Sequence, residues 1–213
     1  MGAPQPLVYL VDDDAAVRKA LGRLIASAGY RVQAFGTARE FLDRGDSEDG
    51  PACVVLDVRL GDLDGLDVQR ELGIADSIMP IVFITGRGDV PTSVRAMKAG
   101  ATDFLTKPVR DADLLSAIEQ ALSRAEKARA ERAEIDAIRK CLDSLTPRER
   151  EVMALVVSGR LNKQIALELG TVEKTVKVHR ARVMEKMRAA SLADLVRITG
   201  KVGIPRPADR QGR

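Results

Sequence analysis

Residues 7–13 read LVYLVDD, a run of five apolar or aromatic residues that ends in two aspartates. A short apolar run with no polar residue inside it is typical of a strand buried on both faces of a sheet. The pattern recurs at residues 53–57, CVVLD, and at residues 81–85, IVFIT, each time with a polar residue at the end. These stretches predict a parallel sheet whose strands end in polar side chains.

Helical patterns separate the predicted strands. Strands are expected at residues 7–11, 32–35, 53–56, 81–84 and 103–106, and helices at residues 15–28, 38–44, 65–72 and 90–99. Strands that alternate with helices indicate an α/β fold, a doubly wound five-stranded parallel sheet with helices on both faces. Ligands of such sheets bind beyond the carboxyl ends of the strands.

From Asp111 onward the pattern is helical. We expect the last helix of the sheet domain, which occupies residues 1–122, to continue as a charged, semi-rigid linker over residues 123–142. Apolar residues recur along it at a 4-3 spacing, but the middle positions are Ala and Arg, which do not support a coiled coil. A frayed tether remains the alternative.

A compact all-helical block is predicted over residues 143–203, followed by a disordered tail over residues 204–213. Thr146 and Glu149 form a capping-box pattern around Pro147. Asn162 is expected to cap a second helix over residues 163–169, which Gly170 ends. A third helix follows over residues 173–188, and Ser191 is expected to begin a fourth helix that continues to about Thr199.

The charge of the chain is unevenly distributed. Residues 143–213 contain 15 basic and 8 acidic residues, a net charge of +7, whereas residues 1–142 contain 19 and 23, a net charge of −4. The asymmetry is explained if the acidic N-terminal part binds a cation and the basic C-terminal part binds a polyanion. Chance clustering of surface charge is the plain alternative. Cys53 and Cys141 fit no metal or disulfide pattern. The sequence shows no membrane-spanning run and no secretion signal, so we expect a cytoplasmic protein.

Polar residues at the predicted strand ends carry the chemistry of the front domain. Asp12 and Asp13 follow the first strand, Asp57 the third, Thr85 the fourth and Lys107 the fifth. Clustered carboxylates repel each other unless a cation joins them, and their hard oxygen ligands favour Mg²⁺. Thr85 and Lys107 could then bind the oxygens of a phosphoryl group held by Asp57.

Residues 7–122 resemble the receiver domain of two-component response regulators, which has a flavodoxin-like fold. The resemblance rests on Asp12-Asp13, Asp57, Gly65, Thr85, Gly100-Ala101, Phe104 and Lys107-Pro108. It implies that a histidine kinase phosphorylates Asp57. It assigns Mg²⁺ to Asp13, Asp57 and the backbone carbonyl of Arg59, with Asp12 in support.

The same resemblance implies that Lys107 binds the phosphate and forms a cis peptide with Pro108, and that Thr85 and Phe104 are the switch pair. One residue departs from the family pattern. Gly61 stands four residues after Asp57, where the family usually has proline, so the loop that meets the kinase is expected to be more mobile.

The third helix of the basic block predicts a DNA-binding face. On a helical wheel Val176, Val183 and Met187 share the core side. The opposite side carries Lys174, Lys177, Val178, Ala181 and Arg182, small and basic residues that suit the major groove. Lys177, Val178 and Arg182 are the candidates for contact with base edges. Contacts with the DNA backbone are expected from Thr175, His179, Lys186, Asn162 and Lys163.

Residues 144–199 resemble the LuxR-type DNA-binding domain, on the residues 145–149, Gly159, 162–166, Leu169, 175–179 and 186–187. Residues 85–91 are similar to the FixJ-type subgroup. The resemblance implies that the helix from Ser191 forms the dimer contact on DNA. Val172 stands where the family often has Ser or Thr, so the cap of the recognition helix is open, with Thr171 as a substitute.

The sequence therefore predicts a response regulator that controls transcription, most simply as an activator. Its expected partners are a histidine kinase, promoter DNA, a second copy of the chain after phosphorylation, and RNA polymerase. Two alternatives remain. Asp12-Asp13-Asp14 resembles the D-x-D motif of haloacid dehalogenase phosphatases, although Ala16 stands where that family has Thr or Val. The other alternative keeps DNA binding without phosphorylation. Beyond phosphoryl transfer to and from its own aspartate, we expect no enzyme activity.

Overall fold

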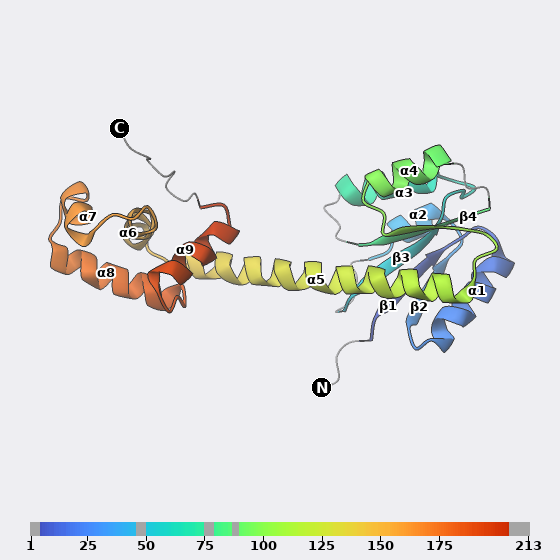
Figure 1. Ribbon diagram of the computed structural model, residues 1–213, viewed down its shortest axis with the longest axis horizontal. Coiled ribbons are helices and arrows are strands. Elements are labelled where there is room, and N and C mark those ends of the chain that lie inside the picture. Colours follow the sequence, from blue (N-terminus) through green and yellow to red (C-terminus); the bar gives the residue numbers. More distant parts are fainter. Residues whose placement is uncertain (1–4, 46–49, 75–78, 87–89, 205–213) are drawn as a thin grey trace. The chain divides into compact units, whose positions relative to one another are not determined.

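A computed structural model describes residues 5–45, 50–74, 79–86 and 90–204 of the chain. The chain divides into two compact units, residues 1–130 and residues 131–213 (Figure 1). One long helix, α5 (Asp111–Asp143), belongs partly to each unit. The segment expected as a linker, residues 123–142, is therefore helical throughout.

The first unit contains a parallel sheet of five strands in the order β2-β1-β3-β4-β5. The strands are β1 (Leu7–Val11), β2 (Arg31–Phe35), β3 (Ala52–Asp57), β4 (Ile81–Thr85) and β5 (Asp103–Thr106). Every residue of β1 and β4 is buried, which explains their unbroken apolar runs. The predicted doubly wound α/β fold is confirmed.

Helices cover both faces of the sheet (Figure 1). Alternate side chains of each central strand enter two separate cores, one on each face. Tyr9 and Leu56 pack beneath α2 (Ala38–Leu42), α3 (Gly65–Ile74) and α4 (Val90–Lys98). Leu10 and Val55 pack on the other face, against α1 (Ala15–Ser27) and the first turns of α5. Because side chains alternate along a strand, a single apolar run fills both cores.

The second unit is a bundle of short helices around one core. It contains α6 (Pro147–Val157), α7 (Asn162–Glu168), α8 (Glu173–Lys186) and α9 (Leu192–Lys201), with the last turns of α5. Thr146 caps α6 in the predicted capping box, and Ser191 caps α9 by accepting a hydrogen bond from the backbone of Asp194. Val176, Val183 and Met187 are buried in this core, as the helical wheel predicts.

Two details of this unit differ from the sequence-based expectation. Asn162 is the first residue of α7 and not its cap. The cap position is Leu161, whose backbone N–H donates to Gln164 Oε1 at 2.9 Å, so the side chain inside the helix reaches back to the cap. Ile204, expected in a disordered tail, packs against the core because it is apolar. Residues 205–213 lie outside the described residues.

Helix α8 begins after the cap residue Val172, and no side chain caps it. Its other end is held to α6 by Lys186. The Lys186 ammonium lies 2.6 Å from Glu149 Oε2 and 3.0 Å from the carbonyl oxygen of Ser144. Glu149 is only 2% exposed, and it also accepts the backbone N–H of Thr146 at 2.9 Å. A buried carboxylate without such partners is costly, so this ion pair fixes α8 against α6.

The contacts of Glu149 make the stability of the second unit depend on pH. The Lys186 hydrogen bond, followed by the Thr146 backbone hydrogen bond, lowers the pKa of Glu149 from 4.5 to about 2. A carboxyl group whose pKa is lowered by folding stabilises the protein above its unfolded pKa and loses that effect as pH falls. We expect the free energy of unfolding of this unit to fall between about pH 4.5 and about pH 2, which urea titrations followed by NMR will measure.

Glu149→Gln should lower the stability at pH 7 and flatten that pH dependence, because the amide keeps the shape but not the charge. Glu151→Gln is the matched control, since Glu151 is exposed and pairs with Arg148 at the surface. Equal pH dependence in the wild-type chain and in Glu149→Gln would contradict the assignment.

Candidate functional site

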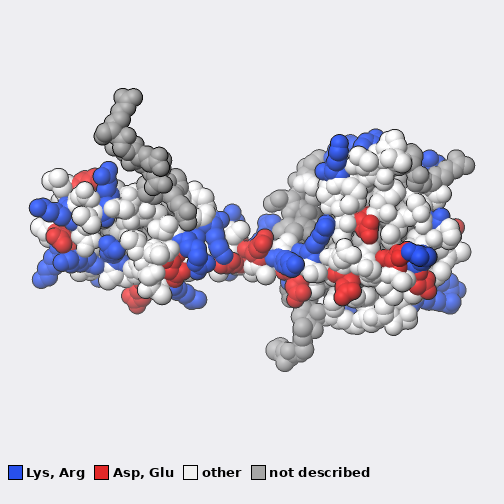
Figure 2. All heavy atoms as spheres, viewed as in Figure 1, with Lys and Arg blue, Asp and Glu red and all other residues white. Residues whose placement is uncertain are grey.

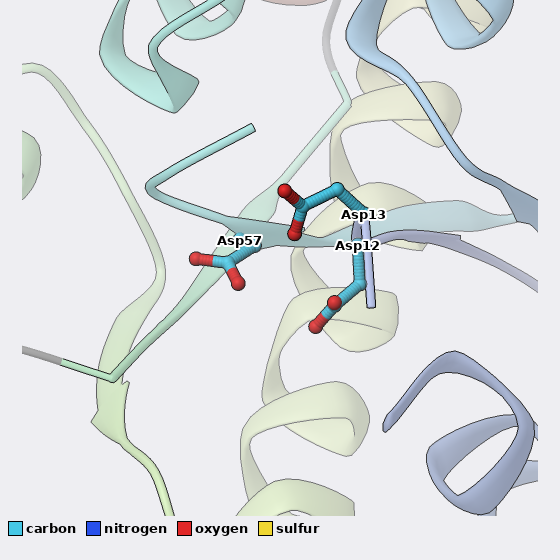
Figure 3. A group of neighbouring side chains, drawn as sticks. All are labelled: Asp12, Asp13 and Asp57. Carbon is cyan, nitrogen blue, oxygen red and sulfur yellow. The ribbon is translucent and has the colours of Figure 1, made fainter. Parts of the chain in front are cut away.

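Three carboxylates meet at the carboxyl edge of the sheet. Asp12 follows β1 directly, Asp13 is the next residue, and Asp57 ends β3. One oxygen from each carboxylate lies within 4.8 Å of the others (Figure 3). Asp12 and Asp57 are buried and Asp13 is exposed, so the group opens to solvent on one side. This arrangement of hard oxygen ligands is consistent with binding of a divalent metal ion.

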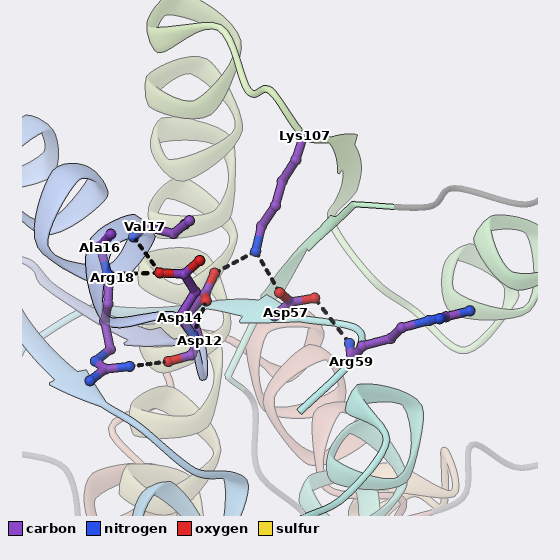
Figure 4. Close-up of polar contacts among 8 residues, drawn as sticks. All are labelled: Asp12, Asp14, Ala16, Val17, Arg18, Asp57, Arg59 and Lys107. Atoms are coloured by element: carbon purple, nitrogen blue, oxygen red, sulfur yellow. Dashed lines mark hydrogen bonds and ion pairs between the residues drawn. The ribbon is translucent and has the colours of Figure 1, made fainter. Parts of the chain in front are cut away.

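Lys107 joins two of the carboxylates. It follows β5, and its ammonium lies 2.5 Å from Asp57 Oδ2 and 2.7 Å from Asp12 Oδ2 (Figure 4). The three partners are separated by 50 and 95 residues in the sequence and meet only because parallel strands end at one edge. One ammonium balances one of three carboxylates, so the group has an excess of two negative charges, which a divalent cation complements.

Burial and the ion pairs shift the ionisation of this group. Burial raises the pKa of Asp12, although the hydrogen bond from Lys107 opposes it. Burial is also the largest influence on Lys107 and lowers its pKa, but the hydrogen bonds to Asp12 and Asp57 outweigh it, so the pKa of Lys107 is raised overall. Lys107 therefore keeps its charge over the physiological pH range.

The loop from β3 to α3 is folded tightly around Asp57. The backbone N–H of Arg59 donates to Asp57 Oδ1 at 2.9 Å. A side chain at Gly65 would place its Cβ atom 2.7 Å from the carbonyl oxygen of Asp57, closer than such atoms approach, so only glycine fits here. Gly61, the departure from the family pattern, lies beside Asp13 with room for a Cβ atom.

Asp62 holds this loop to the start of α2, a contact that the sequence did not reveal. Its two carboxylate oxygens accept the backbone N–H groups of Ala38 at 3.1 Å and Arg39 at 3.0 Å. Both N–H groups belong to the first turn of a helix, where no backbone partner exists. The Asp62 contact restrains the loop that the missing proline was expected to leave mobile.

Two further residues support the aspartates from outside. Arg18 on α1 donates to the carbonyl oxygen of Asp12 at 2.6 Å (Figure 4). Asp14 caps α1 by accepting the backbone N–H groups of Ala16 and Val17. Since the Asp14 side chain is engaged at the helix end, Asp12 and Asp14 do not form the catalytic pair that a D-x-D phosphatase needs.

The expected switch residues occupy neighbouring strands. Thr85 ends β4, one residue after Ile84, which pairs with Asp57 on β3, and it is 1% exposed. Phe104 on β5 is half-buried, and its ring centroid lies 6.1 Å from that of Phe83 on β4. Phe104 thus packs at the margin of the core that α4 covers. The Lys107-Pro108 peptide is cis, as the resemblance implies.

The exposed face of α8 carries the candidates for DNA contact. Lys174, Lys177, Val178 and Arg182 are exposed, whereas Thr175 and His179 are half-buried at its margins. Lys177 pairs loosely with Glu173 at 3.4 Å across one turn, which leaves its ammonium in solvent. Lys163 is exposed at the start of α7. Figure 2 shows Lys and Arg side chains gathered over α7 and α8.

Two predicted contacts with the DNA backbone have partners inside the domain. Lys186 is bound to Glu149, as described above. Asn162 Oδ1 accepts a hydrogen bond from Arg180 on α8 at 3.2 Å, which ties α7 to the recognition helix. Arg180 was missed by the sequence analysis because its position on the wheel does not show which neighbouring helix it reaches.

Part of the stretch that suggested the FixJ-type subgroup, residues 87–89, lies outside the described residues. Among the helices that are described, none combines the length and the apolar character needed to cross a membrane.

Both units match known protein families. Residues 8–119 match the response regulator receiver domain, and residues 143–199 match the bacterial regulatory proteins of the luxR family. The chain is 49% identical to nodulation protein W of Bradyrhizobium diazoefficiens over 93% of its own length and 87% of that protein. It is 44% identical to the transcriptional regulatory protein FixJ of the same organism, over 92% and 96%.

Solved structures give the same result. The response regulator StyR matches with a TM-score of 0.82 and 45% identity, over 92% of this chain and 99% of that one. Full-length FixJ from B. japonicum matches with a TM-score of 0.56 and 43% identity, over 96% and 100%. With an acidic site of the expected geometry in the first unit and a basic helical face in the second, the chain belongs to the response regulators that join a receiver domain to a LuxR-type DNA-binding domain.

Proposed function

We propose that Asp57 accepts a phosphoryl group from the phosphohistidine of a partner histidine kinase, and that this controls sequence-specific binding of promoter DNA. The observation that carries the proposal is the bridge from Lys107 to both Asp57 and Asp12 at the carboxyl edge of the sheet. In the transfer, an Asp57 oxygen forms a bond to phosphorus while the bond from phosphorus to the histidine nitrogen breaks. The electron pair of that bond remains on the imidazole.

The residues of the site fit Mg²⁺. Asp13, Asp57 and the carbonyl oxygen of Arg59 would hold the ion, with Asp12 in support, because their oxygens are hard ligands in a group with excess negative charge. The ion supplies charge neutralisation at the phosphoryl oxygens. Lys107 balances the remaining charge, and Thr85, at the end of the neighbouring strand, donates its hydroxyl to a phosphoryl oxygen.

Movement of Thr85 toward the phosphoryl group would let the Phe104 ring turn inward and reshape the surface formed by α4, β5 and α5. That surface already exposes apolar side chains, with Val90 75%, Val94 43% and Met97 45% exposed. Their exposure supports a phosphorylation-dependent dimer, in which two receiver domains would bury these side chains against each other. On DNA, α9 would then form the contact between two DNA-binding domains, and the dimer would recruit RNA polymerase as an activator in the cytoplasm.

Asp57→Asn should abolish phosphoryl incorporation from acetyl phosphate and Mg²⁺, because the amide lacks the nucleophilic oxygen. Phosphate-affinity electrophoresis measures the incorporation. Asp64→Asn is the control, since Asp64 lies in the same loop but its side chain accepts the backbone N–H of Leu66 and no other hydrogen bond from the residues that the structure describes. Normal labelling of Asp57→Asn would overturn the assignment.

Asp62→Ala should slow phosphoryl incorporation severalfold and weaken Mg²⁺ binding, while Asp57 itself stays in place. The reason is that the loop carrying the Arg59 carbonyl loses its attachment to α2. Asp62→Asn keeps one acceptor oxygen and should give an intermediate rate. Measuring the rate at saturating and at limiting Mg²⁺ separates slower phosphoryl transfer from weaker metal binding. Unchanged rates in both variants would show that the contact between Asp62 and α2 is not needed.

A Gly-Gly insertion after Ala128 should uncouple phosphorylation from DNA affinity, because α5 is one helix from Asp111 to Asp143 and each Gly costs about 1 kcal/mol of helix stability relative to Ala. DNA affinity is measured with and without acetyl phosphate. The same insertion after Gly203, beyond α9, should leave coupling intact. Full coupling in the first variant would mean that the segment is only a tether.

Lys177→Ala should flatten the sequence preference in a binding selection at fixed salt and cost about 1–3 kcal/mol on the preferred site, as expected for a contact to a base edge. Lys163→Ala should keep the preference and lower the salt slope by about one unit, as expected for a phosphate contact. Lys163 is a better choice than Lys186, another predicted phosphate contact, because loss of the Lys186–Glu149 ion pair would disturb the fold. The reverse pattern would mean that α8 enters the groove in another rotation.

A further inference from the structure

A cavity lies at the edge of the sheet opposite to the three aspartates. It has a volume of about 270 Å³ and lies where α3 and α5 meet the residues that precede β4 and β5. Its lining includes Gln69, Leu72, Met79, Thr102, Arg124 and Ala128. All of these residues belong to the receiver unit, and the cavity shares none of them with the acidic site.

Two polar atoms in the lining are buried without a hydrogen-bond partner among the described residues. They are Gln69 Oε1 and Thr102 Oγ1, on side chains that are 8% and 6% exposed. The orientation of the Gln69 amide is fixed, because its Nε2 donates to the carbonyl oxygens of Ala96 at 3.2 Å and Ala99 at 3.1 Å. The reverse orientation would direct the amide oxygen at two carbonyl oxygens. Gln69 Oε1 therefore has no donor among the described residues and is available to accept a hydrogen bond from a ligand.

The chemistry of the remaining lining narrows the choice of ligand. Leu72 and Met79 offer an apolar wall, and Arg124 adds an exposed guanidinium. A water molecule would satisfy the two polar atoms, but it would neither fill this volume nor use the cation. A complementary ligand has a short apolar body, a hydroxyl group for Gln69 and Thr102, and a carboxylate for Arg124.

We propose that this cavity binds a small aliphatic hydroxy acid. The hydroxyl group donates to Gln69 Oε1 and accepts from Thr102 Oγ1, and the carboxylate pairs with Arg124. The site lies beside the C-terminal end of α4, which Gln69 ties to α3 through Ala96 and Ala99. A bound ligand would stiffen that connection, at the base of the surface that the proposed switch remodels.

The test is an NMR titration of the full-length, unphosphorylated protein with 3-hydroxybutyrate. We expect saturable shifts of the Gln69 side-chain amide and the Thr102 backbone amide, with a dissociation constant of about 1 mM for a ligand of this size. Butyrate, which lacks the hydroxyl group, leaves Gln69 and Thr102 unpaired, and 1,3-butanediol, which lacks the carboxylate, leaves Arg124 unpaired, so each should bind at least about tenfold more weakly.

Thr102→Val removes the hydroxyl group at nearly constant shape, and Arg124→Gln removes the cation. Both should weaken binding severalfold, whereas Lys127→Gln, the matched loss of an exposed cation on the same helix, should not. Absence of saturable shifts would mean a water-filled cavity, and equal binding of all three probes would mean unspecific filling. Either result overturns the proposal. Because Asp57→Asn should bind the probe normally, failure here is distinct from failure of the phosphorylation proposal.

Discussion

The convergence of like charges at the carboxyl edge of the sheet is the constraint on which the receiver unit depends. Parallel strands end together, so Asp12, Asp13 and Asp57 are forced within a few ångströms of one another. Burial of Asp12 and Asp57 makes their repulsion harder for solvent to screen. Lys107 relieves only part of it, and the remaining negative charge is consistent with binding of the divalent cation that the proposed phosphoryl transfer requires. Repulsion among the three carboxylates opposes folding when no cation is bound, and the same repulsion favours the cation binding that we propose.

Both the strands of the sheet and the loop after β3 hold the residues of the site around Asp57. The strands place the carboxylates, and their two apolar faces anchor them in separate cores. The loop after β3 is held by other means: Gly65 allows close approach to the Asp57 backbone, and Asp62 binds the first turn of α2. At the position where the receiver resemblance leads us to expect a proline, this chain has Gly61, and the Asp62 carboxylate contact lies next to it. The hydrogen bonds of the Asp62 carboxylate thus restrain the loop in place of the ring of a proline.

The DNA-binding unit is organised around a single buried charge. Glu149 completes the cap of α6 and binds Lys186 at the end of α8, so one carboxylate sets both the start of the first helix and the position of the recognition helix. Because Lys186 at the end of α8 is paired with Glu149, it is not a free surface charge. The exposed cations on the opposite face, among them Lys174, Lys177 and Arg182, remain for a polyanion.

The sequence by itself determined the strands, the helices and the residues at the carboxyl edge. Apolar runs such as residues 7–11 and caps such as Thr146 and Ser191 are local signals, because backbone geometry and short-range hydrogen bonds decide them. The grouping of Asp12, Asp13, Asp57 and Lys107 also followed, since strand order in a parallel sheet fixes which ends meet. The basic face of α8 followed from helical periodicity.

Only the tertiary structure decided which partner each long polar side chain reaches. The helical wheel placed Lys186 near the core side but did not show Glu149, which lies 37 residues away. Asn162 was expected to cap α7, yet it accepts from Arg180 on α8, because the two helices pack against each other. The Asp62 contact and the Gln69 hydrogen bonds likewise join residues 23 or more positions apart. Such contacts depend on how helices are stacked, and the periodicity of a single segment carries no information about its neighbours in space.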